Sequence, residues 1–189
     1  KINGFDVLKQ PEEAKKCVGY LPELPPLYMD MTVKEYLDFV AELKKLEKSL
    51  RAGYVKEAMK ITKTEEVSGR LIRNLSKGYR QRVGFAQAVL GYPEILILDE
   101  PTVGLDPKQI IEIRDLIKEL GKKHTIILSS HILSEISAVC DHVFIISHGK
   151  LVASDSTENL LERMTGAQEI ELLVKAEEDT AETAIREVA

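Results

Sequence analysis

The sequence predicts an α/β fold in which a mostly parallel sheet carries an inserted α-helical subdomain. Residues 95–98 are apolar without alternation, and residues 125–129 form a second buried run; both have the length of strands buried on both faces, as in parallel sheets. Between them, residues 110–120 carry the apolar stripe of an amphipathic helix, so that the two strands are joined as parallel neighbours. Helical periodicity between residues 32 and 61 predicts the inserted helices.

The composition is that of a globular protein with one core of ordinary size. The 189 residues carry a net charge of −5, which argues against nucleic acid as a partner because neutralising phosphates requires a basic face. No apolar run approaches the ~18 residues that a membrane span needs. Cys17 and Cys140 lie in apolar contexts without metal-ligand spacing, which favours reduced thiols in the cytoplasm.

The first part of the chain alternates short strands and turns. Residues 1–7 predict two short strands joined by a turn at Asn3 and Gly4. Residues 17–21 predict a buried strand that Pro22 interrupts, leaving Glu23 at a strand end. The Pro-rich residues 24–28 form a stiff connector. Its apolar side chains fit either a plain core or a groove that receives a helix of a partner, and both interpretations stay open here.

Two helices follow the connector. Thr32 and Glu35 have the spacing of a capping box, and the helix that they begin is expected to run to about Lys48. Its apolar face contains Tyr36, Phe39, Val40, Leu43 and Leu46. A second helix is predicted over residues 51–61, and the polar residues 62–73 lead to Leu75.

Residues 75–81, Leu-Ser-Lys-Gly-Tyr-Arg-Gln, predict a capped helix start that suits an anion. Ser76 is a favoured N-cap residue, and Gly78 leaves the backbone bare where another group must come close. A helix N-terminus offers unpaired N–H donors and about half a positive charge, so a phosphate would be stabilised there. The helix continues through residue 90 and ends at Gly91 and Pro93.

Acidic and basic side chains follow two of the predicted strands directly. Asp99 and Glu100 end the strand 95–98, and because neighbouring residues of a strand point to opposite sides, one can face a metal ion and the other a water. His131 follows the strand 125–129 and should lie at the same edge of the sheet. Between them, residues 101–107 turn the chain into a helix with Pro107 in its first turn.

The remaining residues predict a helix over 133–140, a strand over 143–146 and a hairpin turn at His148 and Gly149. A closing helix is expected near residues 157–163. Residues 167–189 read as the start of an accessory β/α element.

In this order and spacing, residues 75–81, 95–100 and 101–107 resemble the signature motif, the Walker B motif and the D-loop of ATP-binding cassette (ABC) ATPases. The resemblance implies a P-loop NTPase-like core. Residues 1–166 would form a partial nucleotide-binding domain, with a helical subdomain at about 27–90. The family's phosphate loop, Gly-x-x-x-x-Gly-Lys-Ser/Thr, is not found in the sequence. We therefore expect the N-terminal strands and this loop upstream of Lys1, and we expect the 189 residues alone to be inactive.

The resemblance also implies roles for individual residues, with ATP and Mg²⁺ as ligands. Asp99 would orient Mg²⁺ mostly through water, Glu100 would polarise the attacking water, and His131 would contact the γ-phosphate. Glu23 occupies the Q-loop position, where the family commonly has Gln. Ser76, Lys77, Gly78 and Gln81 belong to the signature turn that would close on a partner's ATP, and Asp106 would link the two sites. Lys77 and Tyr79 depart from the usual Gly and Gln of this motif.

Catalysis in this family needs a dimer of nucleotide-binding domains, here a homodimer or a heterodimer. The residues 75–82 and 19–23 look most like bacterial transporter ATPases that pair with a separate multi-span membrane permease, often exporters. Such a subunit would be cytoplasmic and peripheral on the inner face of the cell membrane. Two alternatives remain: an ABC ATPase acting on the ribosome or DNA, and a non-hydrolysing regulatory partner that lends Ser76 and Gly78 to another subunit.

Overall fold

The computed structural model describes residues 1–160 and divides into two compact units, residues 1–141 and a second unit that begins at His142. The predicted boundary near residue 166 and the element at 167–189 lie outside the described residues, so both stay predictions. The first unit contains, in order, α1 (Pro11–Lys16), β1 (Val18–Leu21), α2 (Val33–Leu43), α3 (Lys48–Ile61), η1 (Glu65–Val67), η2 (Ile72–Asn74), α4 (Lys77–Val89), β2 (Ile95–Asp99), α5 (Pro107–Gly121), β3 (Thr125–Ser129) and α6 (Leu133–Ile136).

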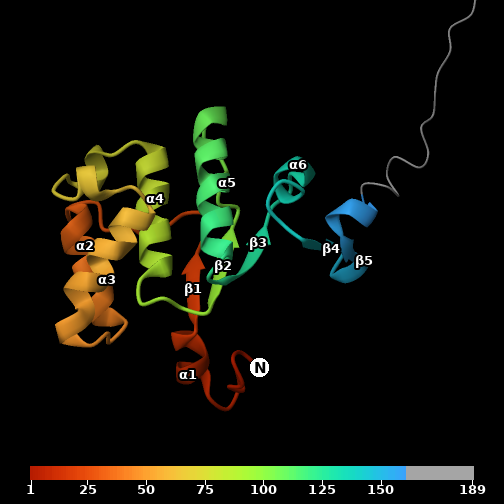
Figure 1. Cartoon of the computed structure of the whole chain (residues 1–189), viewed down its shortest axis with the longest axis horizontal. Helices are drawn as coiled ribbons and strands as arrows, with labels where there is room; N and C mark the ends of the chain where they lie inside the picture. The colour runs from red at the N-terminus through yellow and green to blue at the C-terminus, as the bar shows by residue number, and fades with distance from the viewer. Residues whose placement is uncertain (161–189) are drawn as a thin grey trace, which may run out of the picture. The chain divides into compact units, whose positions relative to one another are not determined.

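The first unit is built on a parallel sheet in the order β1-β2-β3, which confirms the predicted parallel sheet. The register pairs Leu98 with Leu128 and Asp99 with Ser129, so the strands end together at one edge. Helix α5 joins β2 to β3. A short loop joins α4 to β2, and the strand runs in the opposite direction to the helix. The N-termini of α4 and α5 therefore lie at the edge where the strands end (Figure 1).

Strand β2 differs from the prediction of a strand buried on both faces. Leu96 and Leu98 are fully buried, whereas Ile95 and Ile97 on the opposite face are only partly buried. In β3, Ile127 is 56% exposed, so this strand is also covered on one face only. The apolar runs gave the right strands and the wrong degree of burial, because a run of apolar residues does not show which face has a covering layer.

The predicted helices are present with shifted ends. Thr32 and Glu35 form the capping box, in which Thr32 Oγ1 accepts from the Glu35 amide and the Glu35 carboxylate accepts from the Thr32 amide. Helix α2 ends at Leu43 rather than near Lys48, and Leu43 is 62% exposed instead of lying on the apolar face. The chain leaves the helix because Lys45 adopts a positive φ of 55°. Helix α1 is an addition that the sequence reading missed, although Pro11 and two acidic residues mark its first turn.

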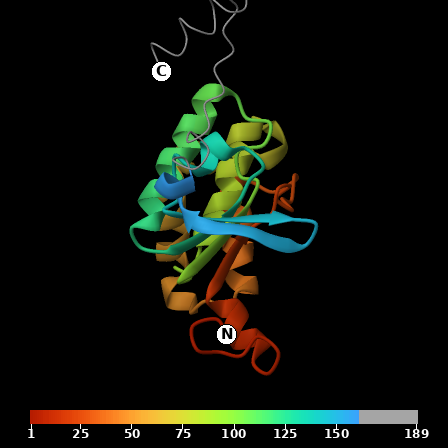
Figure 2. The same ribbon diagram turned by 90° about the vertical axis from the view of Figure 1, so that its right-hand side faces the viewer.

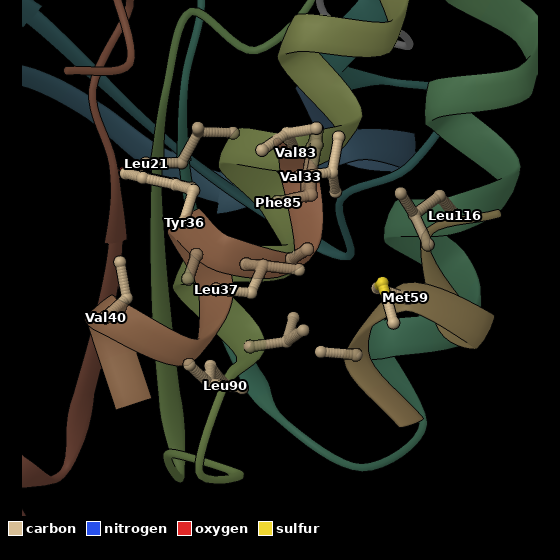
Figure 3. Packing of buried hydrophobic residues seen from close by; sticks show 14 of the residues in the cluster. Leu21, Val33, Tyr36, Leu37, Val40, Met59, Val83, Phe85, Leu90 and Leu116 are labelled. Atoms are coloured by element: carbon tan, nitrogen blue, oxygen red, sulfur yellow. The ribbon is translucent and has the colours of Figure 1, made fainter. Parts of the chain in front are cut away.

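The core joins the helices to one face of the sheet. Figure 1 shows α4 between the α2–α3 pair and the strands, and α5 packs against β3. Figure 2 shows the same unit from the side, with α1 at the amino end of β1. Side chains of α2, α4 and β1, among them Leu21, Tyr36 and Phe85, form one fully buried cluster (Figure 3).

Helix α4 is held close to the sheet and capped at its end by two specific features. A Cβ atom at Gly19 of β1 would lie 2.2 Å from the carbonyl oxygen of Ala88, so only glycine allows this approach. At the C-terminus of α4, Lys44 Nζ donates to the carbonyls of Gln87 at 2.9 Å and Leu90 at 2.8 Å. This ammonium satisfies carbonyls that the helix leaves unpaired, and it suits the negative end of the helix dipole.

The second unit contains an antiparallel hairpin of β4 (His142–Ser147) and β5 (Lys150–Ser156), as the sequence predicted. His148 and Gly149 have φ values of 50° and 72° at its turn, as a tight two-residue hairpin requires. Residues 157–160 are helical, in line with the expected closing helix; its further course lies outside the described residues.

Candidate functional site

The ends of β2 and β3 bring together the acidic and imidazole side chains that the sequence singled out. Asp99 Oδ1 accepts a hydrogen bond of 2.5 Å from Ser129 Oγ, directly across the strand pair. The Glu100 carboxylate lies 2.9 Å from His131 Nδ1 through its Oε1 atom. The prediction that His131 and the Asp99–Glu100 pair share one edge of the sheet is therefore confirmed in geometry.

Glu100 occupies an unusual backbone conformation. Its φ is 44°, a left-handed value that a non-glycine residue rarely adopts. The conformation is held by the Glu100 amide, which donates to the Ser129 carbonyl at 3.2 Å and faces Ser129 Oγ at 3.3 Å. Left-handed non-glycine residues are concentrated at functional sites, because the surrounding structure must stabilise them.

The two carboxylate oxygens of Glu100 have different surroundings. Oε1 meets His131, whereas Oε2 is buried and has no hydrogen-bond partner among residues 1–160. The hydrogen bond and the negative charge of Glu100 raise the pKa of His131, whose side chain is 69% exposed. The arrangement thus leaves one buried carboxylate oxygen without a donor among residues 1–160, beside an imidazole whose pKa is raised by the same carboxylate.

Glu23 is exposed beyond the end of β1 and acts on this cluster at longer range. Its charge is the weakest of the influences that raise the pKa of His131. Its place beyond β1, at the edge where β2 and β3 also end, agrees with the predicted position. Its contact with nucleotide stays a prediction.

The Ser76 turn has the predicted capped start. Ser76 Oγ accepts from the Tyr79 amide at 3.3 Å, and α4 begins at Lys77. The bare backbone at Gly78, however, faces a neighbour within the same chain: a Cβ there would lie 2.7 Å from the Gln109 side chain of α5. The glycine therefore has a packing role in this chain, in addition to the predicted role of letting a phosphate approach.

Lys77 reaches the D-loop of its own chain. A Cβ at Gly104, whose φ is 68°, would lie 2.0 Å from Lys77 Nζ, so the lysine side chain rests on this glycine. Lys77 remains exposed, and its ammonium lies between the signature turn and the loop that precedes α5. Its predicted assistance to phosphate binding is compatible with this position and stays a prediction.

Gln81 and Asp106 both have structural tasks within the chain. Gln81 is 6% exposed, and its Nε2 donates to the Pro101 carbonyl at 3.0 Å. This bond ties α4 to the segment after Glu100, so a nucleotide contact of Gln81 would require the amide to be freed first. Asp106 caps α5 by accepting from the Gln109 amide at 2.9 Å. Its predicted role between two subunits is not excluded by this cap, because the side chain is exposed.

The sequence reading missed three residues that support the site. Ser129 binds Asp99 and the Glu100 amide, and Thr102 donates to Glu135 in the interior. A hydroxyl residue at the end of a strand beside a carboxylate strand end was an available signal for Ser129. For Thr102 and Glu135, 33 residues apart, the sequence held no local signal.

The residues at the strand tips fit a magnesium ion that retains water. Among residues 1–160, no group of three or more His, Cys, Asp or Glu residues is arranged as a metal site. Mg²⁺ is commonly held by one or two carboxylates together with phosphate oxygens and water, so Asp99 with Ser129 beside it is a sufficient protein contribution.

The Asp-Glu pair, the histidine and two capped helix N-termini therefore lie at the carboxyl edge of a parallel sheet, where α/β domains bind their ligands. The family model described as "ABC transporter" matches residues 1–103, more than half of the chain. The chain belongs to the ABC transporter family.

Individual relatives agree with this assignment. The chain is 39% identical over 165 residues to the bacitracin transport ATP-binding protein BcrA of Bacillus licheniformis, covering 86% of the chain and 53% of BcrA. It is 31% identical over 192 residues to the linearmycin resistance ATP-binding protein LnrL of Bacillus subtilis, covering 100% of the chain and 61% of LnrL. The chain thus spans roughly half to two thirds of the length of these relatives.

Solved structures show the same fold. The cbiO1 protein of Clostridium perfringens, part of the ABC transporter complex cbiONQ, is similar with a TM-score of 0.74 and 29% identity, over 80% of this chain and 62% of cbiO1. An ATP-binding subunit of an ABC transporter is similar with a TM-score of 0.73 and 28% identity, over 90% and 71% of the two chains. The prediction of a P-loop NTPase-like α/β fold is confirmed.

Proposed function

We propose that this chain is the catalytic part of an ATP-hydrolysing subunit of a bacterial ABC transporter, which dimerises on ATP and drives export through a separate membrane permease. One observation carries the proposal: Glu100 stands at the tip of β2, with one carboxylate oxygen held by His131 and the other buried without a protein partner among residues 1–160. A general base needs a fixed carboxylate that still has an acceptor site for the proton of its water.

Glu100 and His131 would divide the chemistry. Oε2 of Glu100 is buried and unpartnered among residues 1–160, so the site would have to open to admit the attacking water, which would then donate to this oxygen and be oriented toward the γ-phosphate. His131, whose pKa is raised by Glu100, would place positive charge near the phosphoryl oxygens as negative charge develops there. Its exposure leaves the imidazole accessible to a nucleotide.

Asp99 would hold Mg²⁺ through water, with Ser129 orienting its carboxylate by the 2.5 Å hydrogen bond. When bound, Mg²⁺ neutralises phosphate charge and aligns the β- and γ-phosphates.

The Ser76 turn would serve the nucleotide of a second subunit. Ser76 is exposed at the N-terminus of the thirteen-residue helix α4, and Lys77 adds a positive charge beside it. A phosphate there would meet backbone donors and this cation together. The proposal therefore includes a dimer of two such subunits, either a homodimer or a heterodimer, with Asp106 beside the dimer interface.

A membrane partner is supported by the surface beside Glu23. Leu24, Tyr28 and Met29 are 78%, 54% and 41% exposed, more apolar surface than a short connector needs. Tyr28 is nevertheless ordered by an edge-to-face contact with Phe39. Within the connector, Leu27 packs against the core, whereas the exposed Leu24 and Tyr28 support a docking surface for a permease.

The direction of transport is inferred from the relatives. BcrA and LnrL are named for bacitracin transport and linearmycin resistance, which favours export as the direction. Among residues 1–160, none of the helices has the length and hydropathy needed to span a bilayer. We propose that the subunit lies on the inner face of the cell membrane, attached through its permease.

The test is Glu100→Gln in the complete subunit together with its permease. The variant should retain MgATP and accumulate as a dimer, while turnover falls by about a hundredfold or more because the water loses its base. Glu119→Gln, on the exposed face of α5, is the control and should hydrolyse ATP like the wild type. Unchanged turnover in Glu100→Gln would show that another group activates the water.

A further inference from the structure

Besides the Glu100–His131 pair, a second hydrogen bond joins the same two segments of the chain. Thr102 Oγ1 donates to Glu135 Oε2, and each of these residues is 6% exposed. Thr102 is two residues beyond Glu100, and Glu135 lies in α6, four residues beyond His131.

The geometry points to Glu135 as a positioning residue that keeps His131 against Glu100 by anchoring α6 to Thr102. This inference rests on the proposed function, since it assigns Glu135 to the same site.

The two bonds differ in strength for a physical reason. The His131 side chain is 69% exposed, so its bond to Glu100 competes with water and is screened by salt. The Thr102–Glu135 bond is buried, where water does not compete and an unpaired carboxylate would be costly. The buried bond is therefore the one able to define the path of the chain from residue 131 to residue 135.

The surroundings of Glu135 explain how a carboxylate can be placed there. Arg114 of α5 lines the same small cavity as Thr102 and Glu135, and its Nε atom is buried without a hydrogen-bond partner among the described residues. The carboxylate thus receives a hydroxyl donor and shares the cavity lining with a cationic residue. The Glu135 amide also donates to the Ile132 carbonyl at 3.0 Å, which closes the turn between His131 and α6.

Loss of the anchor should act on chemistry more than on binding. Without the Thr102 bond, the 131–135 segment can move, and His131 need not remain 2.9 Å from Glu100. The nucleotide would still bind, while the oriented pair would be formed only part of the time.

The first test compares Glu135→Ala with Glu135→Gln in the protein, by following the imidazole NMR signals of His131. Glu135→Ala should shift these signals away from those of a ring hydrogen-bonded to a carboxylate. Glu135→Gln, which keeps an oxygen for the Thr102 hydroxyl, should retain them. Unchanged signals in Glu135→Ala, or equal shifts in both variants, would overturn the inference.

The second test measures turnover in the complete subunit. Glu135→Ala should lower kcat by about tenfold or more with KM nearly unchanged, and Glu135→Gln should restore most of the rate. A tenfold rise in KM with an unchanged kcat in Glu135→Ala would contradict a positioning role. Glu119→Ala on the exposed face of α5 is the control and should change neither constant.

If Glu135→Ala does not fold, the same hydrogen bond can be removed by substituting its donor, Thr102. Thr102→Val removes the donor while nearly keeping the volume, and Thr102→Ser restores it; the same contrast in the His131 signals is expected. The NMR measurement needs no ATP hydrolysis. If the His131 signals respond as stated but the wild type does not hydrolyse ATP, the anchor stands and the proposed function fails.

Discussion

Replacing Gly19 by alanine tests the packing of the helix that carries the Ser76 turn. The new Cβ would lie 2.2 Å from the Ala88 carbonyl oxygen and 2.7 Å from Leu96 Cδ2. Leu96 can change its rotamer, but the Ala88 oxygen belongs to the backbone of α4. Because real Cβ contacts essentially never fall below 3.0 Å, α4 and β1 must separate by at least about 0.8 Å.

The expected cost is about 3 kcal/mol of unfolding free energy. Overpacking of a close-packed core costs typically 1–3 kcal/mol, and a backbone obstacle belongs at the upper end of that range. Urea denaturation followed by far-UV circular dichroism measures this cost; the chain lacks tryptophan, which limits fluorescence.

The matched control is Gly53→Ala. Gly53 lies within α3, and its Cβ would meet nothing within 4 Å. Alanine should therefore stabilise the protein by roughly 0.5–1 kcal/mol through its higher helix propensity. If the unfolding free energy of Gly19→Ala lies within about 0.5 kcal/mol of the wild-type value, the close approach of α4 to β1 is not what stabilises this layer.

Two further predictions concern charged groups. Lys44→Met should cost about 1–3 kcal/mol at neutral pH, because carbonyls at the end of α4 lose their donor. Burial lowers the pKa of Lys44 to about 8 in the folded protein, below its value of 10.5 in a model peptide. Between pH 8 and 10.5 the unfolded chain binds more protons than the folded protein. The stability of the wild type relative to Lys44→Met should therefore rise as the pH increases from 8, by at most about 1.4 kcal/mol per pH unit. Urea titrations of both proteins that show no change with pH would contradict this. Glu100→Gln should return the pKa of His131 toward its ordinary value, since the Glu100 hydrogen bond and charge raise it; an NMR titration of the imidazole checks this, and an unchanged pKa would mean that His131 is not paired with Glu100 in solution.

The local features of the fold were readable because each depends on residues a few positions apart. The cap at Ser76, the Thr32–Glu35 capping box, the start of α5 at Pro107 and the hairpin turn at His148 all occur where the sequence predicts them. The strand tips were also predictable, since parallel strands joined by a helix end at the same edge. The end of α2 was not predictable. Leu43 has the spacing of the helix's apolar face, yet its side chain is exposed in the fold.

The sequence by itself determined the family, the order of the elements from β1 onward and the chemical groups at the strand tips, since hydrogen-bonded caps, turns and apolar periods are short-range. Only the tertiary structure decided what surrounds those groups. It placed Ser129 on Asp99, Gln109 against Gly78, and Thr102 on the buried Glu135. These contacts join segments about 30 residues apart whose meeting depends on strand register and helix packing, and no local pattern encodes either.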